Sequence, residues 1–278
     1  MAGAEEKPEK RPLILITNDD GIQAKGLSAL ADAASDLGDV VVVAPDRNRS
    51  GTSHAITLLE PLRCREIRPY WFECGGTPTD CVYLAVHEIL QARPSVVLSG
   101  INAGPNLSFD VHYSGTFGGA AEGTLLGIPS IAISLAELEN GSYAHAAMFA
   151  RQVTVEALRG AVPRSTTLNI NVPRGRPSRY QVTFLGHRLF QHSVHRRDDP
   201  RGAPYYWIGG EPAPPLDIPG SDCNAILDGV ISVTPVSIDM TGWASMSRFL
   251  EAFKVEGMER VEPVLPETPG DAQPEPYA

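Results

Sequence analysis

Short, continuous apolar runs separated by helix-like segments are the feature that most constrains the fold of this chain. Each run has the length of a β-strand without polar–apolar alternation, which is typical of strands buried on both faces of a parallel sheet. Four such runs are LILIT (13–17), DVVVVAP (39–45), SVVLSG (95–100) and SIAIS (130–134). A further strand is predicted for TTLNINV (166–172).

Helical patterns lie between these strands. In residues 25–38 the apolar residues recur on one helical face, and Gly38 would end that helix. Thr77, Pro78 and Asp80 offer an N-cap, a first-turn proline and an acid at N3, so a helix should follow in CVYLAVHEIL. Residues 144–160 form another helical pattern. The alternation predicts an α/β fold with a doubly wound, mostly parallel, Rossmann-like sheet.

The pattern changes after residue 173, where QVTFLG, PYYWIGG and ILDGVISVTPVS favour longer strands or hairpins. We expect a disordered leader at 1–11 and a single α/β domain at 12–250, with an appended C-terminal β extension from about residue 175. Residues 251–278 should form the end of a terminal helix and an acidic, Pro-rich, disordered tail.

Composition excludes several classes of protein. The net charge of −10 includes −5 from residues 251–278, and no basic stripe suggests binding of long nucleic acid. No run approaches the roughly 20 apolar residues that span a bilayer, and the N-terminus lacks the apolar core of a signal peptide. The 4 cysteines show no CxxC pairing, which favours a reduced, cytoplasmic protein.

Polar residues follow three of the predicted strands. Asn18, Asp19 and Asp20 follow the first, residues 46–51 the second and residues 101–106 the third. Ligands of open parallel sheets bind at the carboxyl ends of strands, and oxygen donors suit Mg²⁺ or Mn²⁺ rather than zinc. The alternative for the first group is a turn that uses Asn-Asp-Asp for local hydrogen bonds alone.

The small-residue segment beginning at Ser114-Gly115-Thr116 predicts a helix whose N-terminus could bind an anion. Ordinary capping by Ser114 or Thr116 is the alternative. His192 and His195 are interpreted as surface residues rather than metal ligands. The chain has no GxGxxG after the first strand, no GxxxxGKS and no GxSxG, so neither a dinucleotide fold, a P-loop enzyme nor an α/β-hydrolase is indicated.

Several motifs in one order resemble the SurE survival protein family over roughly residues 13–240. They are NDDG, APDRNRSG, GTPTDCV, SGINAGPN, YSGT, DPRG with YYWIGG, and SD-x-x-A with VTP. The resemblance implies a metal-dependent phosphatase of the 5′/3′-nucleotidase type, acting on nucleoside monophosphates, with some activity on short polyphosphate. It also implies a homodimer or homotetramer that exchanges C-terminal elements between subunits.

The same resemblance implies residue roles. One divalent ion per subunit, Mg²⁺ or Mn²⁺, would be held by Asp19, Asp20, Ser50 and Asn102. Phosphate would be contacted by Asn106, Ser114, Gly115 and Thr116. The catalytic residues would be Asp19, as both metal ligand and proton acceptor, together with Asn106 and Ser114. The role of the Gly-Thr-Pro-Thr-Asp motif at 76–80 is not apparent from the sequence.

This chain departs from the family pattern in three places, which bear on substrate preference rather than on the metal site. Ser108-Phe109 stands where a glycine and an acid are expected. Phe117-Gly118-Gly119 replaces a small aliphatic run, and Asn224 follows Asp222 where a histidine sometimes occurs.

Two other functions remain open. A receiver-like, Mg²⁺-binding regulatory domain also has acids after its first strand, but this chain is much longer and offers Ser99 and Asn102 where a receiver has its aspartate. A metal-dependent sugar-nucleotide transferase would need a DxD motif after a central strand, and none is present. Metal-dependent release of phosphate from a nucleoside monophosphate separates all three functions.

An interface is predicted from exposed-looking aromatic residues in a region without helical cover. They are Phe190, Tyr205, Tyr206, Trp207 and Trp243. We expect part of the region beyond residue 220 to pack on a partner subunit, and the tail after about residue 262 to be dispensable.

Overall fold

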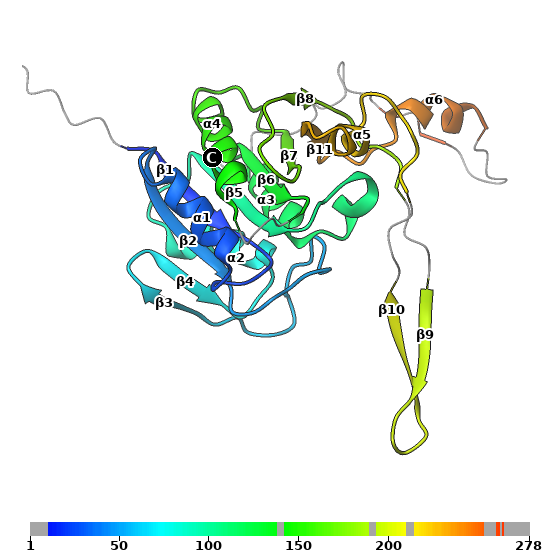
Figure 1. Cartoon of the computed structure of the whole chain (residues 1–278), viewed down its shortest axis with the longest axis horizontal. Coiled ribbons are helices and arrows are strands. Elements are labelled where there is room, and N and C mark those ends of the chain that lie inside the picture. The colour runs from blue at the N-terminus through cyan, green and yellow to red at the C-terminus, as the bar shows by residue number, and fades with distance from the viewer. Residues whose placement is uncertain are drawn as a thin grey trace, which may run out of the picture.

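The computed structural model describes residues 11–137, 142–188, 193–209, 214–252, 260–261 and 263. Within them, a nine-stranded sheet has the order β3-β4-β2-β1-β5-β6-β7-β11-β8 (Figure 1). Its strands are β1 Leu13–Thr17, β2 Asp39–Pro45, β3 Cys64–Arg68, β4 Trp71–Cys74, β5 Val96–Ala103, β6 Ser130–Leu135, β7 Thr166–Val172, β8 Tyr180–Val182 and β11 Ile231–Ser237. The predicted doubly wound, mostly parallel sheet is confirmed, since the central strands from β4 to β7 are all parallel.

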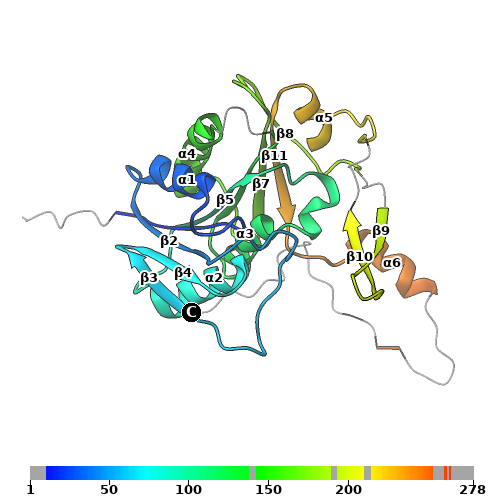
Figure 2. The same ribbon diagram turned by 60° about the horizontal axis from the view of Figure 1, so that its bottom comes forward.

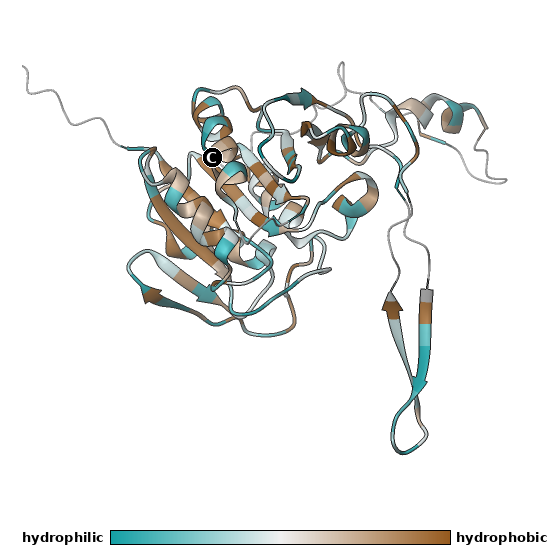
Figure 3. Cartoon of the chain, in the orientation of Figure 1, coloured by the Kyte–Doolittle hydropathy of each residue, from teal (hydrophilic) through white to brown (hydrophobic). Residues whose placement is uncertain are grey.

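Helices cover both faces of this sheet, α1 and α4 on one side and α2 and α3 on the other (Figure 2). They are α1 Lys25–Ala34, α2 Pro78–Leu84, α3 Gly115–Leu125 and α4 Ala144–Leu158, and a π-helical turn, η1 Ala85–Ile89, continues α2. Ile14 and Ile16 of β1 pack beneath α1 and α4, whereas Leu15 packs on the opposite face with α2. Because both faces are covered there, the central strands β1 and β2 are almost continuously apolar, and Figure 3 shows hydrophobic residues concentrated on them.

One helix end differs from the prediction. The first helix ends at Ala34, and Gly38 does not act as its cap. A Cβ at Gly38 would lie 2.2 Å from the carbonyl oxygen of Pro12, so glycine is needed there for close approach of two backbone segments.

The region after residue 173, predicted to be a β extension, contains helices as well as strands. β8 and β11 join the main sheet, β11 antiparallel to β7. The prediction that ILDG begins a strand is wrong, because Ile226 and Leu227 end a helix, α5 Asp222–Leu227, which Ser221 caps. Trp243 begins another helix, α6 Trp243–Ala252, instead of lying in a strand or loop.

A two-stranded antiparallel hairpin stands clear of the body in Figures 1 and 2. It pairs β9 Ser193–Asp198 with β10 Pro204–Gly209. Three of the predicted aromatic residues, Tyr205, Tyr206 and Trp207, lie on β10 and are 41%, 58% and 63% exposed. Phe190, His192, residues 1–10 of the leader and most of the tail lie outside the described residues. In the described part of the chain, no helix combines the length and apolar composition required to cross a membrane.

Candidate functional site

The carboxyl ends of β1, β2 and β5 meet at one edge of the sheet, as predicted. The backbone N–H of Arg49, after β2, donates to the carbonyl oxygen of Asp19 at 2.7 Å. The N–H of Ala103, at the end of β5, donates to Oδ2 of Asp20 at 3.3 Å. These two contacts bring the three polar segments together around the acidic pair.

Local hydrogen bonding in the turn accounts for the presence of Asn18 but not for that of the two aspartates. Asn18 is fully buried, and its amide exchanges hydrogen bonds with the backbone N–H and carbonyl of Gly21 at 3.2 and 3.1 Å. The carboxylates of Asp19 and Asp20 take no part in that turn. They are therefore available for another purpose.

Both carboxylates are in surroundings that disfavour their charged forms. Burial raises the pKa of Asp19, and the neighbouring charge of Asp20 adds to the rise, although a 2.5 Å hydrogen bond from Oγ1 of Thr116 opposes it. Burial also raises the pKa of Asp20, against the hydrogen bond from Ala103. A bound cation would offset the free-energy cost of keeping both groups ionised.

The other two predicted metal ligands lie in the adjoining loops. The side-chain NH₂ of Asn102 donates to the carbonyl of Gly104 at 2.9 Å, which leaves the amide oxygen as the acceptor for a cation. Ser50 is exposed, and its N–H donates to Oδ1 of Asn48 at 2.8 Å, while Nδ2 of Asn48 lies 3.4 Å from Asp20. Among the described residues, no group of three or more His, Cys, Asp or Glu side chains is arranged to hold a metal ion. The predicted metal ligands do not form such a group, because they comprise two carboxylates, one hydroxyl and one amide oxygen.

The N-terminus of α3 packs directly against Asp19. Ser114 is the N-cap, with Oγ accepting from the N–H of Phe117 at 3.0 Å, so the capping interpretation of Ser114 is confirmed. A Cβ at Gly115 would lie 2.8 Å from Cβ of Asp19, so only glycine allows this approach. The positive end of the helix dipole and its free N–H groups therefore lie beside the acidic pair.

Asn106 is held rigidly by residues that the sequence analysis did not single out. Its N–H donates to Oδ1 of Asn171 at 2.8 Å, and its Nδ2 donates to Oγ of Ser134 at 2.8 Å. Its carbonyl accepts from the amides of Asn169 and Asn171 at 2.8 and 3.0 Å. The sequence TTLNINV could have identified these two asparagines, because side chains two residues apart lie on the same face of a strand.

The Gly-Thr-Pro-Thr-Asp motif anchors the loop that carries Ser50. Asp80 completes a capping box with Thr77 at the start of α2. Its fully buried carboxylate also accepts from the N–H and hydroxyl of Thr57 at 2.8 and 2.7 Å, and from the N–H of Thr77 at 2.8 Å. The loop then packs on α3, where Nε2 of His54 lies 2.8 Å from Oε2 of Glu122.

A second buried acid, Asp222, stabilises the turn in which Ser108 stands where a glycine is expected. Ser108 has a positive φ of 55°, which glycine would adopt more easily. Its N–H donates to Asp222 at 2.8 Å and its hydroxyl to the carbonyl of Gly186 at 2.9 Å. Asp222 also accepts from the N–H of Gly186 at 2.7 Å, so it links the segment after Asn106 to the C-terminal region.

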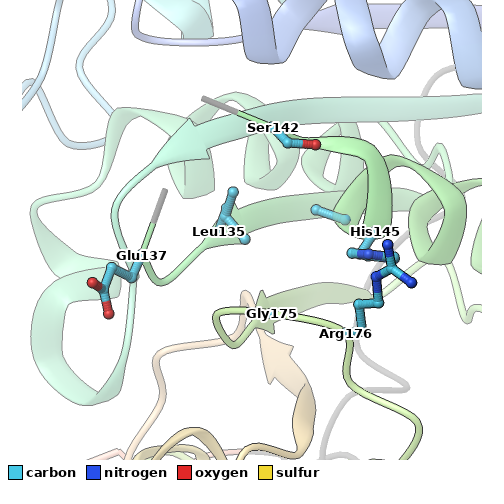
Figure 4. A pocket seen from close by; sticks show the side chains of 7 residues that line it. Leu135, Glu137, Ser142, His145, Gly175 and Arg176 are labelled. Atoms are coloured by element: carbon cyan, nitrogen blue, oxygen red, sulfur yellow. The ribbon is translucent and has the colours of Figure 1, made fainter. Parts of the chain in front are cut away.

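Two cavities open near this edge of the sheet. The larger, about 470 Å³, is mostly apolar and includes Pro105 and Leu107, which flank Asn106, with Ile226 of α5. The smaller, about 270 Å³, has a more polar lining, and Figure 4 shows the side chains of His145 and Arg176 at one end and Glu137 at the other.

Comparison with known proteins places the chain in a family. The family profile described as "Survival protein SurE" matches residues 14–192. A protein named 5′-nucleotidase SurE from Myxococcus xanthus is 46% identical over 260 residues, which cover 92% of this chain and 98% of that protein. A protein of the same name from Geobacter metallireducens is 47% identical over 239 residues, covering 84% of this chain and 94% of that one.

The structural comparison agrees. The crystal structure of the SurE protein from Aquifex aeolicus superposes with a TM-score of 0.75 at 42% identity, covering 85% of this chain and 98% of that chain. The fold is thus shared with the Aquifex protein, and this chain belongs to the SurE family.

Replacing Asp80 with alanine should lower the free energy of unfolding by about 2–4 kcal/mol, because it leaves buried N–H groups without an acceptor. Urea denaturation followed by circular dichroism measures this loss. Asp32→Ala is the control, since Asp32 is exposed and should leave the midpoint unchanged. Equal midpoints for Asp80→Ala and the unmodified protein would contradict the anchoring role.

Proposed function

We propose that this chain is a divalent-metal-dependent phosphomonoesterase that hydrolyses nucleoside monophosphates, with 5′- and 3′-nucleotides and short polyphosphate as its substrate range. The observation that carries the proposal is the packing of Asp19 against the N-terminus of α3, which puts an acidic pair of cation ligands beside an anion site. The names of the Myxococcus and Geobacter relatives support the nucleotidase activity.

The donor set fits one hard cation. Carboxylate oxygens of Asp19 and Asp20, the hydroxyl of Ser50 and the amide oxygen of Asn102 match the preference of Mg²⁺ or Mn²⁺. When bound, such an ion polarises a phosphoryl oxygen and lowers the pKa of a coordinated water. The raised pKa values of Asp19 and Asp20 support this fit, because a nearby positive charge would stabilise the ionised forms of one buried and one half-buried carboxylate.

The phosphoryl group would lie at the start of α3. There the N–H groups around Gly115 and Thr116, the Ser114 hydroxyl and the Asn106 amide would stabilise the charge that develops during hydrolysis. The four hydrogen bonds that fix Asn106 support a preorganised role.

Asp19 would take the proton of the attacking water. The Thr116 hydroxyl fixes the orientation of this carboxylate by donating to Oδ1. The receiver and sugar-nucleotide transferase alternatives predict no metal-dependent phosphate release, so the assays below also test them.

The larger cavity would take the nucleoside. Nucleoside sites are mostly apolar with a few polar groups. The lining of this cavity is mostly apolar and includes Pro105 and Leu107, the neighbours of Asn106 in the chain. The smaller cavity is more polar and less suited to a base.

The assembly would be a homodimer or homotetramer, in a reduced cytoplasm, with exchanged C-terminal elements. Ile208 of β10 is 91% exposed beside the three aromatic residues of that strand, and an exposed apolar strand of this kind favours an interface. The four free cysteines suit the reduced location.

Changing Asp19 or Asp20 to asparagine should lower kcat/KM by at least about 100-fold, because each change removes a charge that binds the cation. Phosphate release from AMP with Mg²⁺ or Mn²⁺ measures activity, and calorimetry measures Mn²⁺ affinity. Asp39→Asn is the matched control, since it removes the same charge at the opposite edge of the sheet. A variant at either position that keeps half of the activity would contradict the metal assignment.

Ser114→Ala should lower kcat by about 10- to 100-fold with little change in KM, because its hydroxyl would act on the transition state. Loss of the cap also costs about 1 kcal/mol of stability. Ser221→Ala controls for that loss, since Ser221 caps α5 in the same way. Equal activities for the two variants would show that Ser114 acts only as a helix cap.

Ile226→Trp should fill the larger cavity and raise KM for AMP several-fold, while KM for phenyl phosphate stays unchanged. Ser142→Trp, in the smaller cavity, should change neither constant. If Ser142→Trp alone raises KM for AMP, the smaller cavity is the nucleoside site.

Light scattering should give the mass of a dimer or tetramer for the full chain, and a chain ending at residue 262 should keep that mass. A monomer at micromolar concentration would contradict the proposed interface. Dissociation of the shortened chain would show that the tail contributes to assembly.

A further inference from the structure

Three of the four cysteines form a cluster that the proposed reaction does not use. Cys64 of β3 and Cys74 of β4 are direct partners across the hairpin, and Cys81 lies beneath them in α2. The thiol of Cys74 is hydrogen-bonded to those of Cys64 and Cys81. Cys64 is exposed, whereas Cys74 and Cys81 are buried.

The strand register gives Cys64 and Cys74 the separation that a disulfide requires. The N–H of Gly75 donates to the carbonyl of Arg63 at 2.9 Å, so the next pair, Cys64 and Cys74, is a non-hydrogen-bonded pair. The Cα atoms of such a pair lie about 4.5 Å apart, within the range of roughly 4.4–6.8 Å that disulfides span. The bond can therefore form without separating the strands.

The environment of Cys74 favours its reactive form. Hydrogen bonds from Cys64 and then Cys81 lower the pKa of the Cys74 thiol, whereas the bond to Cys74 and burial raise that of Cys64. The thiolate is the nucleophile in disulfide exchange. Cys64 is the accessible thiol and Cys74 is its direct neighbour across the hairpin, so Cys74 is placed to resolve a mixed disulfide formed at Cys64.

We propose that Cys64 and Cys74 are a redox-active pair that forms a reversible disulfide by exchange with a small disulfide such as oxidised glutathione. Cys64 loses its proton to solvent and attacks one sulfur of the small disulfide, and the first small thiolate leaves and is protonated. Cys74 loses its proton to solvent, and its thiolate then attacks the Cys64 sulfur and expels the second small thiolate, which is protonated. Two protein thiols and one small disulfide give one protein disulfide and two small thiols.

The pair lies at the base of the loop that carries Ser50. The carbonyl of Cys74 accepts from the N–H of Asp46 at 2.8 Å, and the carbonyl of Gly75 accepts from the guanidinium of Arg49 at 2.5 Å. Disulfides of cytosolic proteins are mostly transient and redox-sensing, which fits a pair with one exposed thiol better than a structural role. A soft-metal site is not proposed, since no suitable cluster of ligands occurs in the described ranges.

The test uses the reduced full-length protein in glutathione buffers of graded redox ratio, followed by differential alkylation and peptide mass spectrometry. The expected result is loss of two of the four alkylatable thiols, a cross-linked peptide pair containing Cys64 and Cys74, and full recovery with dithiothreitol. Cys64→Ser should abolish the cross-link and Cys81→Ser should retain it. Circular dichroism checks that both variants are folded.

Three results would overturn the proposal. They are four reduced thiols in the most oxidising buffer, a stable glutathione adduct at Cys64 without a cross-link, and a cross-link between Cys74 and Cys81. None of these outcomes depends on phosphatase activity, so the test stands apart from the proposed function.

Discussion

The close contact between Asp19 and the first turn of α3 is the constraint on which the site depends. Glycine at position 115 lets the helix approach to within van der Waals distance of Asp19, and the hydroxyl of Thr116 then donates to its carboxylate. This contact removes water from one acid of an adjacent pair, which raises its pKa. It also aligns the positive end of a helix with the edge where three strands end. A cation and an anion are thereby favoured within one small region.

Buried polar residues hold the loops around that contact. Asp80 fixes the loop after β2, Asp222 fixes the turn at Ser108, and the amides of Asn169 and Asn171 fix Asn106. Asp80 and Asp222 each accept from several backbone or hydroxyl groups, so loss of either carboxylate leaves buried groups unsatisfied. The rigidity of the site therefore comes from residues that would not contact the substrate.

The sequence predicted the core of the fold because strands buried on both faces are continuously apolar, as LILIT and DVVVVAP are. It also predicted that the polar residues after these strands meet at one edge of the sheet, as they do. It failed where tertiary contacts decide the outcome. Ile226 and Leu227 have strand-like character, yet the Ser221 cap and the buried Asp222 make that segment a helix. The partners of Asp80 and Ser108 are distant in the sequence, and no local pattern identifies them.

The central claim is that one cation binds between Asp19 and Asp20 with phosphate at the start of α3. Anomalous diffraction from crystals grown with Mn²⁺ and inorganic phosphate tests it directly. The account predicts a single strong manganese peak bounded by the two carboxylates and Asn102, with phosphate density touching the N–H groups after Ser114. A manganese peak elsewhere, or phosphate bound away from α3, would contradict it.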